Sequence, residues 1–386
     1  MAMKNRILLF AFYSMILNAL FRPLNGQLTI VFGYITILLS LIYPFVAAHN
    51  SGMLLIDKRT LLLVIVLIIS MISSLGSIGT IGTDNAVISI ISLIAFYWSL
   101  SISGTKEQSV YIQDICRANY FLCAILLVFG YGPFGFKYTE VGVWGYKIFT
   151  MGLGNPNTVS VYVMFSMMLL LIQTGIAKNR IQTFINILLI ASLFYLLILL
   201  SSRTVVACVI LLLTEYVVAK RGNHIRYYWI FILACPIIMI VIQQFLGNSV
   251  IGLTLLGKAI ETGRSNMFNT VISDIKSNPM GFIFGKVFSY QFENLHNAPL
   301  TIVANLGFIG LIVYLTIWFK KIKSLNEICN NKIRVIALYS ILAFIIQSSS
   351  EALLMVGSIP YGVMVIIIDR IAKGEIIDKY SIETTE

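Results

Sequence analysis

Three side chains in this sequence have the types and surroundings suited to chemistry on a phosphorylated substrate. Arg203 lies in the stretch LLSSRTVV, Arg264 in ETGRSNMF, and His296 in ENLHNAPL. A guanidinium can bind phosphate oxygens through a planar pair of N–H donors, so two arginines can form a site for a diphosphate. A histidine can accept a proton near neutral pH and can therefore deprotonate an attacking hydroxyl. Together the three predict group transfer from a diphosphate donor to a hydroxyl acceptor.

Each residue also has an ordinary structural interpretation. Arg203 can anchor a helix end at lipid headgroups, and Arg264 can be a solvated loop residue. Asn297 has the type and position of a helix N-cap, because Pro299 follows in the expected first turn. Such a cap would hold the adjacent His296 at the mouth of a helix bundle. Asn297 is thus a structural residue as well as a candidate for substrate binding.

The elements that would position these residues are membrane-spanning helices. Hydrophobic residues make up 58% of the 386 residues and charged residues only 11%, whereas soluble domains carry about 25% charged residues. The apolar runs are continuous rather than alternating with a period of two, which indicates helices and not the strands of a barrel. We therefore expect an all-α integral membrane protein, with residues 1–386 forming a single polytopic domain.

The sequence predicts about twelve spans. They cover residues 7–21, 28–46, 60–78, 86–101, 116–131, 158–174, 181–200, 204–219, 228–245, 299–319, 334–349 and 352–369. If the N-terminus is cytoplasmic, most of the 27 lysines and arginines lie on the cytoplasmic side, as the positive-inside rule requires. Both termini are then cytoplasmic, and the net charge of +11 needs no nucleic-acid partner. The first apolar run is interpreted as a retained span, since no cleavage site follows it.

Two long connections are expected on the outer side, at 132–157 and 246–297. Long loops in an otherwise compact helical protein are usually functional. In the second loop, between the ninth and tenth spans, apolar residues recur at helical spacing: Phe268, Val271, Ile272 and Ile275. This pattern predicts an interfacial helix on the outer leaflet, and the SNPMG stretch after it predicts a turn. The topology brings both arginines and the histidine to one membrane face.

The sequence does not indicate metal-dependent chemistry. The five cysteines form no CxxC pair, and the outer segments contain no Asp-x-Asp motif or histidine cluster. We therefore expect a site without a metal or another cofactor. A disulfide and a thiolate metal site are not expected either.

The stretch HNAPLTIVANLGFIG consists of His-Asn, nine residues and Gly-x-x-Gly. In this pattern it resembles the O-antigen ligase and polymerase superfamily, and the matching residues are His296, Asn297, Gly307 and Gly310. The SSRT stretch around Arg203 and the TGRS stretch around Arg264 are similar to the two arginine signatures of that superfamily, in the same order. The resemblance covers residues 180–350, and the first half of the chain agrees only in its pattern of spans.

The resemblance implies a helical bundle in the bacterial cytoplasmic membrane, with a large periplasmic loop over a lipid-facing cavity. It implies a metal-independent glycosyltransferase whose donor is an undecaprenyl-diphosphate-linked oligosaccharide. Arg203 and Arg264 would hold the diphosphate, and His296 would position or deprotonate the acceptor hydroxyl. The two glycines would let the tenth helix pack closely against its neighbours. Membrane lipid, a flippase and a chain-length regulator are the further partners implied.

The acceptor distinguishes two activities in this superfamily. A polymerase joins the glycan to another lipid-linked repeat unit of O-antigen or capsule, whereas a ligase transfers it to the lipid A core of lipopolysaccharide. The stretch MGLGNPNTV resembles a segment typical of the polymerases, although Asn155 or Asn157 can instead cap the sixth span. The polymerase is our preferred hypothesis and the ligase the first alternative. A flippase or exporter of the lipid-linked oligosaccharide is the second, but the sequence lacks the related halves typical of transporters.

Two carboxylates are secondary candidates for the site. Glu293 lies three residues before His296, and Glu351 lies in the last outer hairpin, QSSSEALL. Either can orient His296 or contact a sugar. A solvated loop position is the ordinary interpretation of Glu293. A charge between two spans costs more, which favours Glu351.

Overall fold

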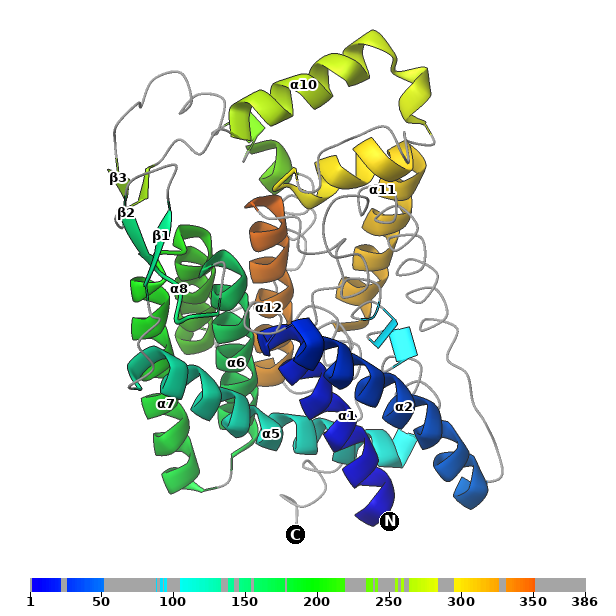
Figure 1. Ribbon diagram of the computed structural model, residues 1–386, viewed down its shortest axis with the longest axis vertical. Coiled ribbons are helices and arrows are strands. Elements are labelled where there is room, and N and C mark those ends of the chain that lie inside the picture. Colours follow the sequence, from blue (N-terminus) through cyan, green and yellow to red (C-terminus); the bar gives the residue numbers. More distant parts are fainter. Residues whose placement is uncertain are drawn as a thin grey trace.

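The computed structural model describes most of the helical segments of the chain (Figure 1). The described residues are 2–21, 26–51, 88, 91–92, 94–95, 105–132, 138–141, 146–153, 156–177, 179–218, 234–238, 240–241, 254–255, 258–259, 264–283, 295–325 and 331–350. Helices dominate these segments, so the prediction of a mainly helical protein is confirmed.

The helix bounds follow the predicted spans within a few residues, except that α5 starts well before its span. The helices are α1 (Ala2–Phe21), α2 (Gly26–Ser51), α5 (Thr105–Tyr131), α6 (Pro156–Ile176), α7 (Arg180–Leu199), α8 (Arg203–Val218), α10 (Arg264–Ser277), the 3-10 helix η3 (Met280–Phe282), α11 (Ala298–Leu325) and α12 (Asn331–Ser350). The spans expected at 60–78 and 352–369 lie outside the described residues. Those expected at 86–101 and 228–245 are described only in part.

Within the described residues, α7 is the one helix that is long and apolar enough to cross a membrane by itself. Shorter apolar stretches occur in α1, α2, α5, α6, α8, α11 and α12. The number of spans therefore stays a prediction.

Two short hairpins depart from the all-helical expectation. In the connection 132–157, β1 (Tyr138–Val141) pairs antiparallel with β2 (Tyr146–Phe149). In the connection 246–297, β3 (Thr254–Leu255) pairs antiparallel with β4 (Lys258–Ala259). The strands are too short to produce a clear alternating pattern, although the aromatic and β-branched residues of YTEV and YKIF favour extended structure.

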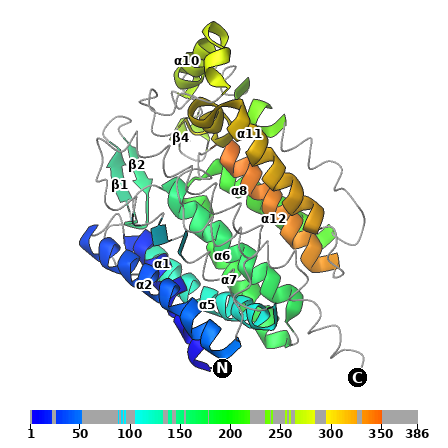
Figure 2. The same ribbon diagram turned by 90° about the vertical axis from the view of Figure 1, so that its right-hand side faces the viewer.

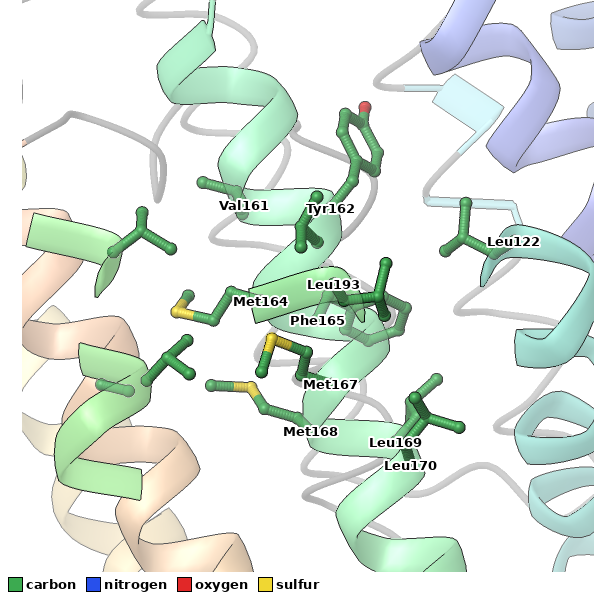
Figure 3. Close-up of a cluster of buried hydrophobic side chains, with 14 of the residues drawn as sticks. Leu122, Val161, Tyr162, Met164, Phe165, Met167, Met168, Leu169, Leu170 and Leu193 are labelled. Carbon is green, nitrogen blue, oxygen red and sulfur yellow. The ribbon is translucent and has the colours of Figure 1, made fainter. Parts of the chain in front are cut away.

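The interior of the bundle is centred on α6 and α12. Every residue from Val159 to Gln173 in α6 is buried, as expected for a helix surrounded by others. In Figure 3, Met164 and Met168 extend to one side of α6, and Leu169 to the other. This helix packs against α5, α7, α8 and α12.

Polar side chains cross-link the helices inside this apolar core. Asn119 in α5 donates its amide to the Ser166 carbonyl of α6 at 2.9 Å. Asn186 in α7 donates to Thr174 Oγ1 in α6 at 3.1 Å and accepts from Tyr120 Oη in α5 at 2.6 Å. Buried amides that bond across helices fix how those helices pack.

The outward faces of α2 and α7 are apolar. Both helices carry exposed stripes in which large apolar residues recur at intervals of three, four or seven positions. The exposed residues include Leu28, Val31, Tyr34, Leu38, Leu41 and Phe45 on α2, and Ile181, Phe184, Leu188, Tyr195 and Ile198 on α7. An apolar exterior around buried polar groups is the reverse of a water-soluble surface.

Helix α10 lies across one end of the bundle, opposite the end where α1 begins (Figures 1 and 2). Its apolar face is covered by protein. Phe268 and Val271 cluster with Leu295 and with Leu300 and Ala304 of α11. A helix is present at the predicted residues, and its apolar face packs in a cluster with the first segment of α11. Its expected position on the lipid leaflet stays a prediction.

Helix α11 bends sharply at Gly307, which has φ 71° and ψ −172°. The segment before Gly307 runs beneath α10, and the segment after it descends along the bundle (Figure 1). After the bend, the Ile309 N–H donates a hydrogen bond to the Ile283 carbonyl at 3.2 Å. The continuous span expected at 299–319 is therefore two helical segments that meet at Gly307. Glycine is almost the only residue that can adopt this backbone conformation.

Candidate functional site

Arg203 is the first residue of α8 and follows a tight reversal of the chain. Helix α7 ends at Leu199, and Leu200–Ser202 connect the two helices. Ser201 has a left-handed backbone with φ 53°. The connection between the spans expected at 181–200 and 204–219 is present but lies one residue earlier than predicted, so Arg203 belongs to α8. The Arg203 side chain is partly buried.

The start of α8 lies at the same end of the bundle as the last turn of α12. The Cys208 thiol in α8 donates to the Ala343 carbonyl of α12 at 3.2 Å. At a rise of about 1.5 Å per residue, Cys208 lies about 7.5 Å along α8 from Arg203, and Ser349 lies about 9 Å beyond Ala343. The two helices pack side by side and run in opposite directions (Figure 1). Arg203 and Ser349 are therefore at nearly the same height.

Asn297 attaches the loop before α11 to this end of the bundle. Its Oδ1 accepts from the Leu300 N–H at 3.0 Å, which confirms the predicted N-cap. Its Nδ2 donates to the Ser349 carbonyl at 3.1 Å and to the Pro236 carbonyl at 3.3 Å. The residue is 0% exposed. These bonds favour the structural interpretation of Asn297 over substrate contact.

His296 lies between two buried neighbours, Leu295 and Asn297. Its φ is 50°, in the left-handed region that residues with a Cβ seldom adopt. Its own side chain is only partly buried. The loop thus buries the side chains on either side of His296 and leaves the imidazole closer to the surface.

Arg264 begins α10, whose first turn lies close to the same loop. Phe268, one turn after Arg264, belongs to the buried cluster that contains Leu295, the residue before His296. The start of α10 is therefore near the His296 loop. The side chain of Arg264 lies outside the described residues.

Three elements distant in sequence thus lie at the α10 end of the bundle: the start of α8, the start of α10 and the loop before α11. Each begins with or contains one of the residues predicted to carry the chemistry. The backbone positions of Arg203, Arg264 and His296 therefore share one end of the bundle. Guanidinium and imidazole groups are the types that hold a diphosphate and accept a proton.

The remaining candidates are distributed differently. Glu293, Glu351 and Asn155 lie outside the described residues. Asn157 lies inside the first turn of α6, which begins at Pro156, so of the two expected caps only Asn155 precedes the helix. Gly310 is a helical residue of the second segment of α11.

Two features of this end of the bundle were not predicted from the sequence: the backbone partners of Asn297 and the bend at Gly307. Pro236 and Ser349 bind Asn297 through backbone carbonyls, which any residue type supplies, so no sequence pattern could identify them. Gly307 was expected to allow close packing, whereas it bends α11. A glycine in the middle of an apolar run is compatible with both roles.

The comparisons with known proteins leave the family open. No protein-family model matches the chain, and no curated protein matches it. The functional assignment therefore depends on the residues and their arrangement.

Proposed function

We propose that the chain is a multi-pass protein of the bacterial cytoplasmic membrane, with about twelve spans and both termini in the cytoplasm. The apolar outward stripes of α2 and α7 support this proposal, because a lipid environment removes the cost of exposing them. The buried amides of Asn119 and Asn186 support it further, since polar groups in membrane bundles face the interior. In this arrangement, α10 and the loop 246–297 are on the periplasmic side.

The proposed activity is that of a polymerase, which joins undecaprenyl-diphosphate-linked oligosaccharide repeat units into O-antigen or capsular polysaccharide. One observation carries this proposal: the starts of α8 and α10 and the His296 loop share one end of the bundle. Their sequences also resemble the signatures of the O-antigen ligase and polymerase superfamily.

The chemistry is a single displacement. His296 accepts the proton of the acceptor hydroxyl, and the hydroxyl oxygen attacks the anomeric carbon of the donor sugar. The bond between that carbon and the diphosphate oxygen breaks, and undecaprenyl diphosphate leaves with the electron pair. Arg203 and Arg264 hold the diphosphate and offset the charge that grows on it. Attack from the opposite face inverts the anomeric carbon.

The proposal is tested with Arg203→Ala, Arg264→Ala and His296→Ala, and with Arg180→Ala as a matched control. Arg180 is exposed and begins α7, at the far end of the bundle. Each of the first three changes should lower chain extension by about 100-fold or more, the usual effect of losing a catalytic group. Polymer length on gels and extension by the purified proteins measure it. Normal long chains in all three variants, at normal protein levels, would refute the proposal.

Deletion of the gene distinguishes the polymerase from the ligase. Loss of a polymerase leaves single repeat units on the lipid A core, whereas loss of a ligase accumulates long glycan on the carrier lipid. A third result distinguishes a transporter: purified protein that extends lipid-linked repeats without any gradient is a polymerase and not an exporter. In the deletion strain, accumulation of long glycan on the carrier lipid would assign the ligase activity instead of the polymerase activity.

A further inference from the structure

The loop before α11 fixes the backbone of His296 from both sides. Leu295, which is 1% exposed, belongs to the same buried cluster as Phe268 of α10. Asn297, which is 0% exposed, is bonded to α12. Between them, His296 keeps a left-handed φ of 50°. Such a conformation persists only where the surrounding structure imposes it.

Asn297 supplies bonds that few other side chains can supply. Its Oδ1 caps α11, and its Nδ2 donates to two carbonyls, those of Ser349 and Pro236. Aspartate would keep the capping oxygen but has no hydrogen to donate, and its charge would face both carbonyl oxygens. Serine would keep a capping oxygen on a shorter side chain. Mutation can therefore remove the bonds that Nδ2 donates to the carbonyls while it keeps the bond that caps α11.

We propose that Asn297 is a positioning residue that clamps the His296 loop onto the end of α12 and so aligns the imidazole with the acceptor hydroxyl. The inference rests on the proposed function, because it concerns the proton transfer of that reaction. Asn297 acts through His296 and does not contact the substrate. A displacement of a catalytic group by about 1 Å can lower a rate by about 100-fold.

The test uses full-length protein in lipid vesicles and compares Asn297→Asp and Asn297→Ser with wild type. Both variants should lose about 100-fold in kcat for extension of a lipid-diphosphate-linked repeat unit, with KM changed by less than about threefold. Binding of undecaprenyl diphosphate, measured as affinity and as moles bound per mole of protein, should not change, because the arginines are untouched.

Thr301→Val is the matched control. Thr301 is 4% exposed and donates its hydroxyl to the Asn297 carbonyl at 2.8 Å. The change removes one buried bond at the same cap and leaves the Asn297 amide in place. Extension by this variant should stay within about threefold of wild type.

Two results would overturn the inference. One is a kcat for Asn297→Asp and Asn297→Ser equal to that of Thr301→Val. The other is a fall in kcat matched by an equal fall in bound undecaprenyl diphosphate per protein, which would mean that Asn297 only supports folding. Neither result touches the proposed function, which fails if Arg203→Ala, Arg264→Ala and His296→Ala all produce normal long chains at normal protein levels.

Discussion

At the scale of single residues, Arg203 and Arg264 can be tested through the shape of their head groups as well as their charge. Arg203→Lys and Arg264→Lys retain the positive charge but lose the planar fork that binds two oxygens at once. Loss of one charge-assisted hydrogen bond costs roughly 1.5–3 kcal/mol, or about 10- to 100-fold in activity. We expect each variant to reduce extension by this factor, measured as kcat/KM.

The alanine variants at these positions should be more impaired than the lysine variants, because alanine removes the charge as well. Full activity in either lysine variant would mean that a point charge suffices and would contradict bidentate binding at that position. The Arg180→Lys variant serves as the control, since Arg180 is exposed at the far end of α7.

At the scale of elements, the bend in α11 depends on Gly307. Gly307→Ala forces a side chain into φ 71°, ψ −172°, which should lower the free energy of unfolding by about 1–3 kcal/mol. Gly310→Ala is the matched change in the helical segment after the bend. It should leave stability unchanged or raise it by up to about 1 kcal/mol, because alanine favours helix.

Denaturant unfolding in detergent measures both glycine variants. Gly307→Ala should also impair chain extension, since the bend carries the first segment of α11 beneath α10. Equal stability of the two variants would contradict the assignment of the bend to Gly307.

At the scale of the whole molecule, the proposed orientation predicts which surfaces are reached from outside the cell. Met280, 74% exposed at η3, lies at the α10 end, whereas Lys323 is exposed near the end of α11. In a background without the native cysteines, Met280→Cys should react with a membrane-impermeant maleimide on intact cells. Lys323→Cys should react only after the membrane is permeabilised. The reverse pattern would invert the topology, and labelling of both on intact cells would contradict a membrane between them.

Much of the local structure could be predicted from the sequence. The span expected at 181–200 is α7, Arg180–Leu199, because a long uninterrupted apolar run has few alternatives to a helix. The turn before Arg203 and the cap at Asn297 were also predictable, since both depend on residues within a few positions. Local sequence patterns also identified Arg203, Arg264 and His296 as candidates for the site.

The tertiary structure decided what these local patterns leave open. Burial of apolar surface is non-directional, so the stripe at Phe268 and Val271 fits lipid as well as protein, and only the fold directs it onto α11. Asn297 could be identified as a cap, but not as the clamp that joins Ser349 and Pro236, because its partners are backbone carbonyls distant in sequence. The sequence by itself therefore determined where most of the described helices lie along the chain, to within a few residues. The packing of those helices decided which of their ends lie at the same end of the bundle.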